Sequence, residues 1–419
     1  MRYHIVSLGC PKNTVDSERY SWVFEEAGWS RSGDIDSSDL VLLNTCAFIA
    51  PATEESLDSL QELMDWREEE QGRKLVLAGC LPGRYPDDGS GGLESIDLVL
   101  GPGDWRKLGA WLGISAPEDS LLSGGGSYRY LKIAEGCSNR CAYCTIPSIR
   151  GDFRAVPAGV IEREARLLVS QGAGEIGLVA QDSGSWSHGG LSFTGLVRGL
   201  LERHPDTWFR LYYLHPLHFP RDIAELFQEF PNLLPYIDMP VQHASTGILQ
   251  RMGRGYGEAE LRGIMEGLEA LPFDIAVRYT VITGYPGETD TDFEVLRSFL
   301  GDYRCGRHIA AFTWHPEEGT PEYSRTIRRR DSVPDGVASE RLAMLSAVGD
   351  ALYSSWDERL TGRETDVLAD DDETGHTVWD APEVDSVVAF TEKVEPGKVV
   401  RARILDSSGA VLLAEPLDD

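Results

Sequence analysis

Three cysteines within eight residues restrict this chain more than any other feature of its sequence. Cys137, Cys141 and Cys144 form a CxxxCxxC pattern. It follows directly on an apolar run with strand character, Tyr130–Ala134. Iron–sulfur clusters are held by cysteine thiolates, usually four of them. Three close cysteines can hold three irons of a four-iron cluster and leave the fourth iron open to a ligand. The competing interpretation is a zinc knuckle, but no fourth Cys or His follows at ligand spacing.

A second group of cysteines is spread along the first 80 residues. Cys10, Cys46 and Cys80 each end an apolar run, and they are spaced 36 and 34 residues apart. If those runs are parallel strands, the three thiols emerge at one carboxyl edge of a sheet, where open α/β sheets bind ligands. A single buried cysteine is often only a small hydrophobe. Three in equivalent places predict a second three-cysteine site, and Cys305, outside both groups, is predicted to be a structural or free thiol.

The hydrophobic pattern predicts an α/β fold with three domains, at residues 1–118, 123–352 and 353–419. The first alternates strand-like runs with helical stretches, which predicts a parallel sheet of βαβ units. Its strands are expected at Tyr3–Leu8, Leu40–Leu43 and Leu75–Ala78, and its helices at Ser17–Ala27 and Glu54–Glu70.

The second domain repeats the alternation six times, which predicts a whole or partial TIM-like (β/α)6 barrel with its site at the strand carboxyl ends. A closing helix is expected over Glu340–Leu360. The strands are expected at Tyr130–Ala134, Glu175–Ala180, Phe209–Leu214, Tyr236–Met239, Ile275–Thr283 and Ile309–Thr313.

The last 67 residues change to short strands between turn signals, which predicts a small antiparallel β-barrel. Those strands are expected at Thr365–Leu368, Ser386–Phe390, Val399–Leu405 and Ala410–Ala414.

Net charge limits the partners. The formal charge of −29 argues against a general polyanion binder and against an anionic membrane surface. No run reaches the roughly 18 apolar residues of a membrane span, and the N-terminus carries no signal-peptide run. We therefore expect a cytoplasmic protein, whose thiols stay reduced and serve as ligands.

These motifs together resemble the radical S-adenosylmethionine methylthiotransferases, and the resemblance covers essentially the whole chain. Such enzymes have an N-terminal cluster domain, a radical core and a C-terminal TRAM domain. Within the family, Ser7–Asn13, Val15–Glu18 and Asp380–Asp385 resemble the ribosomal protein aspartate branch (RimO-type). Asn44–Cys46 and Ile146–Gly151 fit the family as a whole.

The resemblance implies two 4Fe–4S clusters and S-adenosylmethionine as cofactors. Cys137, Cys141 and Cys144 would hold the radical cluster, and Cys10, Cys46 and Cys80 an auxiliary cluster that delivers sulfur. A radical made from S-adenosylmethionine would take a hydrogen from the β-carbon of an aspartate in the small-subunit ribosomal protein numbered twelve. A second S-adenosylmethionine would supply the methyl group. An external electron donor and a sulfur source are implied as partners.

Six further residues are candidate contacts for S-adenosylmethionine, and no catalytic residue is predicted beyond the cluster ligands. Arg278 could grip a carboxylate bidentately, or form a solvent-facing salt bridge. Gly284 and Gly287 resemble the family's glycine motif after the fifth strand, or a common Gly/Pro turn. Glu175, Gln181 and Gln242 begin or end strands where the family places cofactor contacts. His215 and His218 form an HxxH that we interpret as unliganded.

Two other functions remain open from the sequence. A tRNA adenosine methylthiotransferase would use the same cofactors, but an RNA-binding TRAM domain should be basic. Here Asp357–Asp419 holds 17 acidic and six basic residues, a net charge of −11, which suits a basic ribosomal protein and no direct nucleic-acid specificity. A non-catalytic iron–sulfur carrier or scaffold is disfavoured because carriers ligate every iron.

Overall fold

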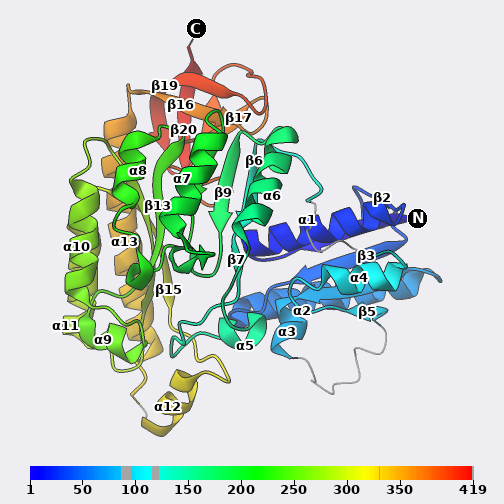
Figure 1. Ribbon diagram of the computed structural model, residues 1–419. Helices are drawn as coiled ribbons and strands as arrows, with labels where there is room; N and C mark the ends of the chain where they lie inside the picture. The colour runs from blue at the N-terminus through cyan, green and yellow to red at the C-terminus, as the bar shows by residue number, and fades with distance from the viewer. Residues whose placement is uncertain (86–95, 116–121, 330, 418–419) are drawn as a thin grey trace.

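The computed structural model describes residues 1–85, 96–115, 122–329 and 331–417. An N-terminal α/β unit lies against one side of a large central unit, and a small β-barrel covers one end of that central unit (Figure 1). None of the described helices combines the length and apolar character needed to cross a bilayer. The α/β class expected from the sequence is confirmed.

The N-terminal unit is a parallel sheet with strand order β2-β1-β3-β4-β5. Chain direction along the sheet reverses between β1 and β3, a switch point at which open α/β sheets bind ligands. The strands are β1 (Arg2–Ser7), β2 (Ser30–Arg31), β3 (Leu40–Thr45), β4 (Lys74–Gly79) and β5 (Leu98–Val99). The helices are α1 (Pro11–Glu26), α2 (Ala50–Glu69), α3 (Cys80–Arg84) and α4 (Trp105–Leu112).

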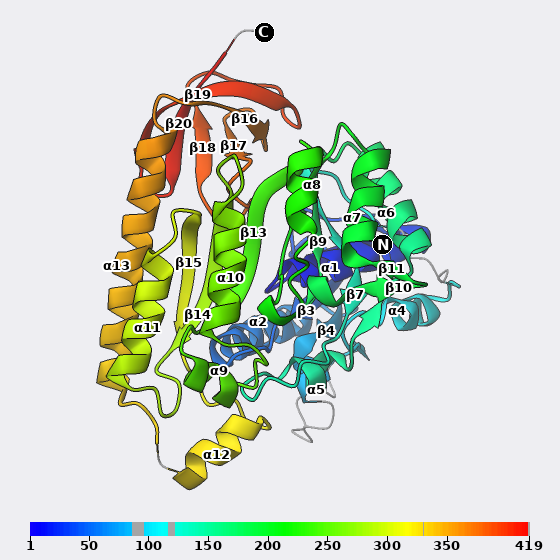
Figure 2. The same cartoon turned by 60° about the vertical axis from the view of Figure 1, so that its left-hand side comes forward.

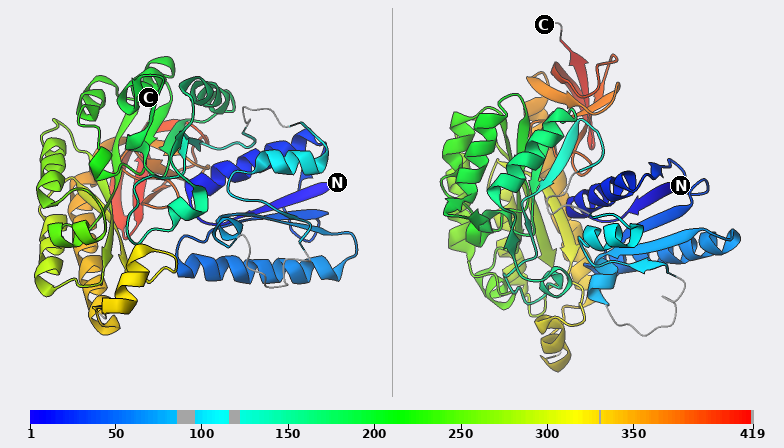
Figure 3. Two further views of the ribbon diagram at one scale, coloured as in Figure 1. Left: turned by 60° about the horizontal axis from the view of Figure 1, so that its bottom comes forward. Right: turned by 45° about the vertical axis from the view of Figure 1, so that its right-hand side comes forward.

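Helices cover both faces of this sheet, as Figure 3 shows. One core cluster joins the sheet to α1 and α4, and a second joins its other face to α2. Strand β3 is therefore buried along its whole length, which its unbroken apolar sequence requires. Helix α1 begins earlier than the expected Ser17, because Pro11 has its φ preset for a first helical turn.

The central unit is a six-stranded parallel sheet that curves into an open barrel, with strand order β15-β14-β13-β12-β9-β6. Helices line its outer face (Figure 2). The strands are β6 (Tyr128–Lys132), β9 (Glu175–Val179), β12 (Trp208–Leu211), β13 (Leu233–Gln242), β14 (Ala276–Thr283) and β15 (Gly306–Thr313). The outer helices are α6 (Ala158–Ser170), α7 (Phe193–Arg203), α8 (Ile223–Glu229), α10 (Glu258–Glu269), α11 (Asp290–Gly301) and α13 (Asp335–Leu360). The expected partial (β/α)6 barrel is confirmed.

Shorter elements occupy the connections of the central unit. They are β7 (Ala134–Glu135), α5 (Ile146–Arg150), β8 (Arg154–Ala155), β10 (Ser187–His188), β11 (Leu191–Ser192), α9 (Thr246–Arg251) and α12 (Pro321–Arg329). The hairpin of β7 and β8 encloses the loop that carries the CxxxCxxC cysteines.

The C-terminal unit is a closed barrel of five strands, in the order β16-β17-β18-β20-β19. The expected barrel is confirmed, but β18 and β20 pair in parallel rather than antiparallel. A ring with an odd number of strands cannot alternate direction throughout, so one parallel pair is unavoidable. The strands are β16 (Glu364–Ala369), β17 (Thr374–Thr377), β18 (Val387–Phe390), β19 (Val399–Ser408) and β20 (Val411–Pro416). Strand β17 was not expected, because its sequence TGHT carries no apolar side chain.

This barrel closes the amino-terminal end of the central strands. Arg210 on β12 donates to Glu175, the first residue of β9, at 2.7 and 3.0 Å, and to the backbone carbonyl of Thr377 in the C-terminal unit. Arg307 on β15 forms an ion pair with Asp380 at 2.8 Å. Helix α13 continues unbroken to Leu360 and so crosses the expected domain boundary at 352/353.

We expect His376 to make docking of the C-terminal unit sensitive to pH. Its ring nitrogens lie 3.1 Å from Glu175 Oε2 and 2.8 Å from Asp370 Oδ2. Burial lowers the pKa of His376, but the two carboxylates outweigh burial and raise it from 6.5 to about 9. The imidazolium therefore contributes its full stabilisation below about pH 6.5, and this is lost as the pH rises through about 9.

The corresponding substitution is His376→Gln, with the exposed His188→Gln as its control. His376→Gln should lower the free energy of unfolding by about 3 kcal/mol at pH 6 and reduce its fall between pH 6.5 and 9. Urea unfolding across this range measures both effects. An unchanged pH dependence in His376→Gln would contradict the assignment.

Candidate functional site

Cys10, Cys46 and Cys80 lie together at the carboxyl edge of the N-terminal sheet. Cys10 is the N-cap residue of α1 after strand β1, Cys46 follows β3, and Cys80 opens α3 directly after β4. The three strands are neighbours in the sheet, so their carboxyl ends meet at one edge. The prediction that these thiols share an edge is confirmed, and the edge includes the switch point between β1 and β3.

Two glycines without side chains allow the three cysteines to approach. Gly9 has φ +91°, and a Cβ there would lie 2.7 Å from Cys46 Cβ and 3.0 Å from Cys46 Sγ. Gly79 has φ +93°, and a Cβ there would lie 2.5 Å from the carbonyl oxygen of Thr45. At both positions φ is positive and a Cβ would clash with a neighbouring atom, so glycine is required there.

Burial and neighbouring charges shift the pKa values of these three thiols. Burial raises the pKa of Cys46 to about 11, and the neighbouring Cys10 and Cys80 raise it further. Burial also raises the pKa of Cys80. Burial acts the same way on Cys10, but Lys12 and Arg150 outweigh it and lower its pKa. Three thiolates in this space repel one another, and a bound metal cation is what would let all three ionise.

Cys137, Cys141 and Cys144 lie in the loop between β7 and α5. The N–H of Cys137 donates to the carbonyl of Gly151 at 3.0 Å, and the N–H of Ala142 donates to that of Met252 at 2.8 Å. Gly136, at φ +76°, lets the loop pass close to Gly151. Burial raises the pKa of Cys144 to about 12, with a further increase from the other two cysteines.

Each cysteine group has its own buried arginine, which donates to one of the group's sulfur atoms. Arg150 Nη2 lies 3.5 Å from Cys80 Sγ, and Arg254 Nη1 lies 3.4 Å from Cys141 Sγ. Hydrogen bonds to cluster sulfurs are among the factors that set the potentials of iron–sulfur clusters. Both groups therefore combine thiols with neighbouring N–H donors, the kinds of group that can hold an iron–sulfur cluster.

Sulfur spacing distinguishes a cluster from a single zinc ion. Zinc at about 2.3 Å from each sulfur holds tetrahedral ligands about 3.8 Å apart. Among the described residues, one group of three possible metal ligands has all its ligand atoms within 4.8 Å of one another. It consists of Asp182, His215 and His218. Neither cysteine group is that compact, so both suit a larger cluster better than a zinc ion.

The Asp182, His215 and His218 group does not have the proton arrangement of a ready metal site. The Nδ1 atom of His215 accepts the N–H of Leu217 at 3.1 Å, so a neutral ring carries its proton on Nε2. His218 Nδ1 lies 2.6 Å from Asp182 Oδ2, an oxygen that also accepts from Asn139. We keep the interpretation of the HxxH as unliganded.

The two cysteine groups face each other across a buried ionic network. Arg150 lies six residues after Cys144 and reaches Glu135 Oε1 at 2.9 Å and Asn13 Oδ1 at 2.5 Å. Lys132 forms ion pairs with Asp16 of α1 and, at 2.9 Å, with Glu135. The network joins the carboxyl edge of the N-terminal sheet to that of the central barrel.

Four of the six predicted cofactor contacts lie at the carboxyl edge of the barrel. Gln181 follows β9 and donates to Glu135 Oε1 at 3.2 Å, while its own Oε1 is buried without a partner. Gln242 ends β13 at φ +63°. Gly284 and Gly287 form the turn after β14, whose N–H groups at 284 and 285 donate to Glu288. Their contact with S-adenosylmethionine stays a prediction.

The other two predicted contacts lie at the opposite end of the barrel. Glu175 begins β9 and is engaged by Arg210 and His376. Arg278, third in β14, forms an ion pair with Asp385 of the C-terminal unit. Glu175 begins its strand, as the sequence indicated, and both residues stand in the first half of their strands. Their contact with S-adenosylmethionine stays a prediction. Their charges hold the C-terminal barrel in place.

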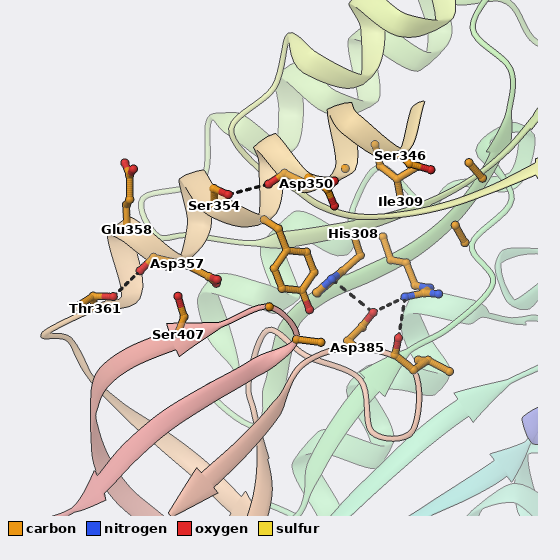
Figure 4. Close-up of a pocket in the computed structure, with 18 residues that line it drawn as sticks. His308, Ile309, Ser346, Asp350, Ser354, Asp357, Glu358, Thr361, Asp385 and Ser407 are labelled. Atoms are coloured by element: carbon orange, nitrogen blue, oxygen red, sulfur yellow. Dashed lines mark hydrogen bonds and ion pairs between the residues drawn. The ribbon is translucent and has the colours of Figure 1, made fainter. Parts of the chain in front are cut away.

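A cavity of about 950 Å³ lies beside this junction, between β15, α13 and the C-terminal barrel (Figure 4). It is lined by Arg278, His308 and Asp385, and by acidic residues of α13 such as Asp350 and Glu358. None of the six cysteines of the two groups lines it. The cavity therefore belongs to the domain junction and not to the cysteine site.

Sequence reasoning missed the two arginines and Lys12. Arg150 was part of a motif that fitted the family, but its reach to Cys80 depends on how the domains pack. Arg254 stands in the sequence RMGRG, which carries no distinguishing pattern. Lys12 belongs to the motif around Cys10, but the sequence did not indicate that only 9% of it is exposed in the folded protein.

Comparisons with known proteins agree with this geometry. Residues 2–101 match the Uncharacterized protein family UPF0004, residues 131–300 the Radical SAM superfamily, and residues 361–417 the TRAM domain. A RimO protein of Sorangium cellulosum is 35% identical over all of this chain and 91% of its own length. One from Moorella thermoacetica is 36% identical over 96% of each chain. Both are named ribosomal protein uS12 methylthiotransferase.

The chain belongs to the RimO family. Its radical SAM domain implies the use of S-adenosylmethionine and a 4Fe–4S cluster, and the family resemblance of the sequence is confirmed. The fold matches the radical S-adenosylmethionine methyltransferase TsrM from Kitasatospora setae, with a TM-score of 0.58 and 14% identity over 78% of each chain. The cobalamin-dependent radical enzyme OxsB matches with a TM-score of 0.52 and 12% identity, over 78% of this chain and 55% of that one. At such identities these two structures support the fold alone.

The close approach of Gly9 to Cys46 leads to a paired test. We expect Gly9→Ala to destabilise the protein and to displace the Cys46 thiol, which lowers the iron retained after reconstitution. Gly28 has a similar φ of +79° but no atom within 4 Å, so Gly28→Ala isolates the backbone strain, about 1–2 kcal/mol.

Gly9→Ala should cost about 1–3 kcal/mol more than Gly28→Ala because of the added steric contact. Denaturant unfolding and iron analysis of both variants measure the difference. Equal stability and equal iron content in the two variants would contradict the close packing at Cys46.

Proposed function

We propose that this chain is a methylthiotransferase that adds a methylthio group to the β-carbon of an aspartate in ribosomal protein uS12. The observation that carries the proposal is the placement of two three-cysteine groups at facing carboxyl edges, joined through Arg150. Named RimO relatives between 33% and 36% identical support the same assignment. The substrate in their names is uS12.

We propose two 4Fe–4S clusters, one at Cys137, Cys141 and Cys144 and an auxiliary one at Cys10, Cys46 and Cys80. When bound, the first supplies the electron that cleaves S-adenosylmethionine to a radical, and the second supplies the sulfur. Arg254 and Arg150 each place a fixed positive charge and an N–H donor beside one group. Both arginines are buried, which excludes water from the sulfur atoms they contact.

The residues between the two cysteine groups hold the cysteine-bearing loops in position and take no part in the chemistry. Asn13 donates to the carbonyls of Leu8 and Thr45 at 2.8 and 2.9 Å, which holds the loops that carry Cys10 and Cys46. Glu135 accepts from Lys132, Arg150 and Gln181, so it fixes the start of the CxxxCxxC loop. An electron donor and a sulfur source from outside the chain complete the proposed reaction.

We propose three functional domains at residues 1–118, 123–352 and 353–419. The three family matches fall one in each range, which supports the division. Part of the first junction lies outside the described residues. Helix α13 connects the second and third domains.

The charge of the C-terminal domain favours a protein over RNA as substrate. Its net charge of −11 from Asp357 to Asp419 repels phosphates and attracts a cationic protein. A tRNA adenosine substrate is the alternative that the following experiment separates from uS12.

Iron content tests the two clusters. Anaerobically reconstituted protein should hold about eight irons, and a variant with Cys10→Ala, Cys46→Ala and Cys80→Ala about four. Cys305→Ala is the matched control, because Cys305 is buried beside Glu269 and belongs to neither group. It should keep about eight irons. Unchanged iron in the triple variant would remove the proposed auxiliary cluster.

Mass spectrometry of a strain without the gene tests the substrate. We expect the ribosomal aspartate to lack its methylthio group in this strain. The modification should return when the wild-type gene is restored but not when the Cys141→Ala gene is supplied. The methylthio content of tRNA should stay unchanged. Loss from tRNA, with the ribosomal aspartate still modified, would replace the proposal by the tRNA function.

A further inference from the structure

Lys12 is a buried lysine that forms no ion pair or hydrogen bond with the described residues. It follows Cys10 by two residues in the first turn of α1, and only 9% of its surface is exposed. Its Nζ lies 3.3 Å from the centroid of the Tyr213 ring. Among the described residues, no hydrogen-bond acceptor and no carboxylate is within bonding distance of this ammonium.

Other buried cations of the junction are satisfied. Lys132 has Asp16 and Glu135, and Arg278 has Asp385. Arg254 donates to the carbonyl of Pro240 and the phenol of Tyr256. An ammonium in a dry site is unfavourable unless an anion joins it, and a cation–π contact offsets only part of that desolvation. Lys12 interacts with the thiolate of Cys10 through space but forms no ion pair with it, so its ammonium remains available to bind an anion.

The surroundings of Lys12 show where such an anion would lie. Tyr213 follows strand β12 with φ +59°. Burial raises the pKa of its phenol, and the nearby charges of Cys10 and of Asp238 in β13 raise it further. Lys12 thus extends from the edge of the N-terminal sheet into the barrel. Asp238 Oδ1 is buried without a partner and does not form an ion pair with Lys12.

We propose that Lys12 binds the carboxylate of the substrate aspartate. This inference rests on the proposed function, which requires an aspartate whose β-carbon is modified. That carbon is one bond from the carboxyl carbon, so an ammonium beside Cys10 that holds the carboxylate also holds the β-carbon near the sulfur-delivering group. Lys12 is then a substrate-binding residue that selects a carboxylate.

One other carboxylate can enter this space, that of S-adenosylmethionine. The two sources differ in a measurable way, because binding and cleavage of S-adenosylmethionine can be followed without the ribosomal protein. The experiment therefore needs one arm with substrate and one arm without it.

The first arm measures the affinity of reconstituted full-length enzyme for uS12 and for uS12 with its target aspartate changed to Asn. Wild-type enzyme should prefer the aspartate form by about 10- to 100-fold. Lys12→Met should bind both forms alike, and Lys12→Arg should keep part of the preference. Lys74→Met is the matched control, because Lys74 also lies over an aromatic ring, that of Trp111 at 5.1 Å, away from the cysteines.

The second arm separates this role from a structural one. Lys12→Met should keep its iron content, its affinity for S-adenosylmethionine and its thermal stability, since Met removes a buried unpaired charge and retains the apolar stem. Equal binding of the two uS12 forms by wild-type enzyme would overturn the inference, as would a preference that persists in Lys12→Met. Weaker binding of S-adenosylmethionine by Lys12→Met, with the preference intact, would assign the carboxylate to the cofactor and also overturn it.

These outcomes are separable from failure of the proposed function. If wild-type enzyme does not methylthiolate uS12, the proposed function fails whatever Lys12 does. If it methylthiolates uS12 and Lys12→Met keeps the aspartate preference, only the role of Lys12 fails.

Discussion

The buried ionic network around Arg150 is the interaction on which the rest of the site depends. Arg150 and Lys132 are almost fully buried, and between them they join Asp16 of the N-terminal domain to Glu135 of the central barrel. Removing one member would leave a buried charge unpaired, which is far more costly than never having had the pair. The network therefore fixes one arrangement of the domains, in which both carboxyl edges face each other and Arg150 reaches Cys80.

The opposite end of the barrel is closed by a second set of charges. Glu175, Arg210 and His376 form one group, and Arg307 with Asp380 forms another. These residues carry strong charges in a dry place, a combination that also marks functional sites. Their partners identify them as the attachment of the C-terminal barrel. The acidic surplus of that barrel is thus partly structural.

Sequence patterns predicted most of the fold because each pattern has a local physical cause. The unbroken apolar run at Leu40–Leu43 is what a parallel strand covered on both faces needs, and β3 is such a strand. Strand β17 escaped prediction because Gly375, His376 and Thr377 are buried through polar contacts rather than apolar ones. The parallel pair of β18 and β20 is a property of a closed ring of five strands, which no single segment encodes.

The sequence by itself determined where the cysteines stand: three follow three neighbouring strands, and three lie in one loop after a strand, which predicts two metal-binding groups. Only the tertiary structure decided what surrounds them. Glu175 and Arg278 were predicted as cofactor contacts, Glu175 from its place at a strand end and Arg278 from its guanidinium. In the structure they pair with residues 201 and 107 positions away. In the sequence, Lys12 was only part of a family motif. In the structure, the packing of the domains buries its ammonium over the Tyr213 ring. Pairing between distant charges depends on how domains meet, and a linear pattern carries no information about that meeting.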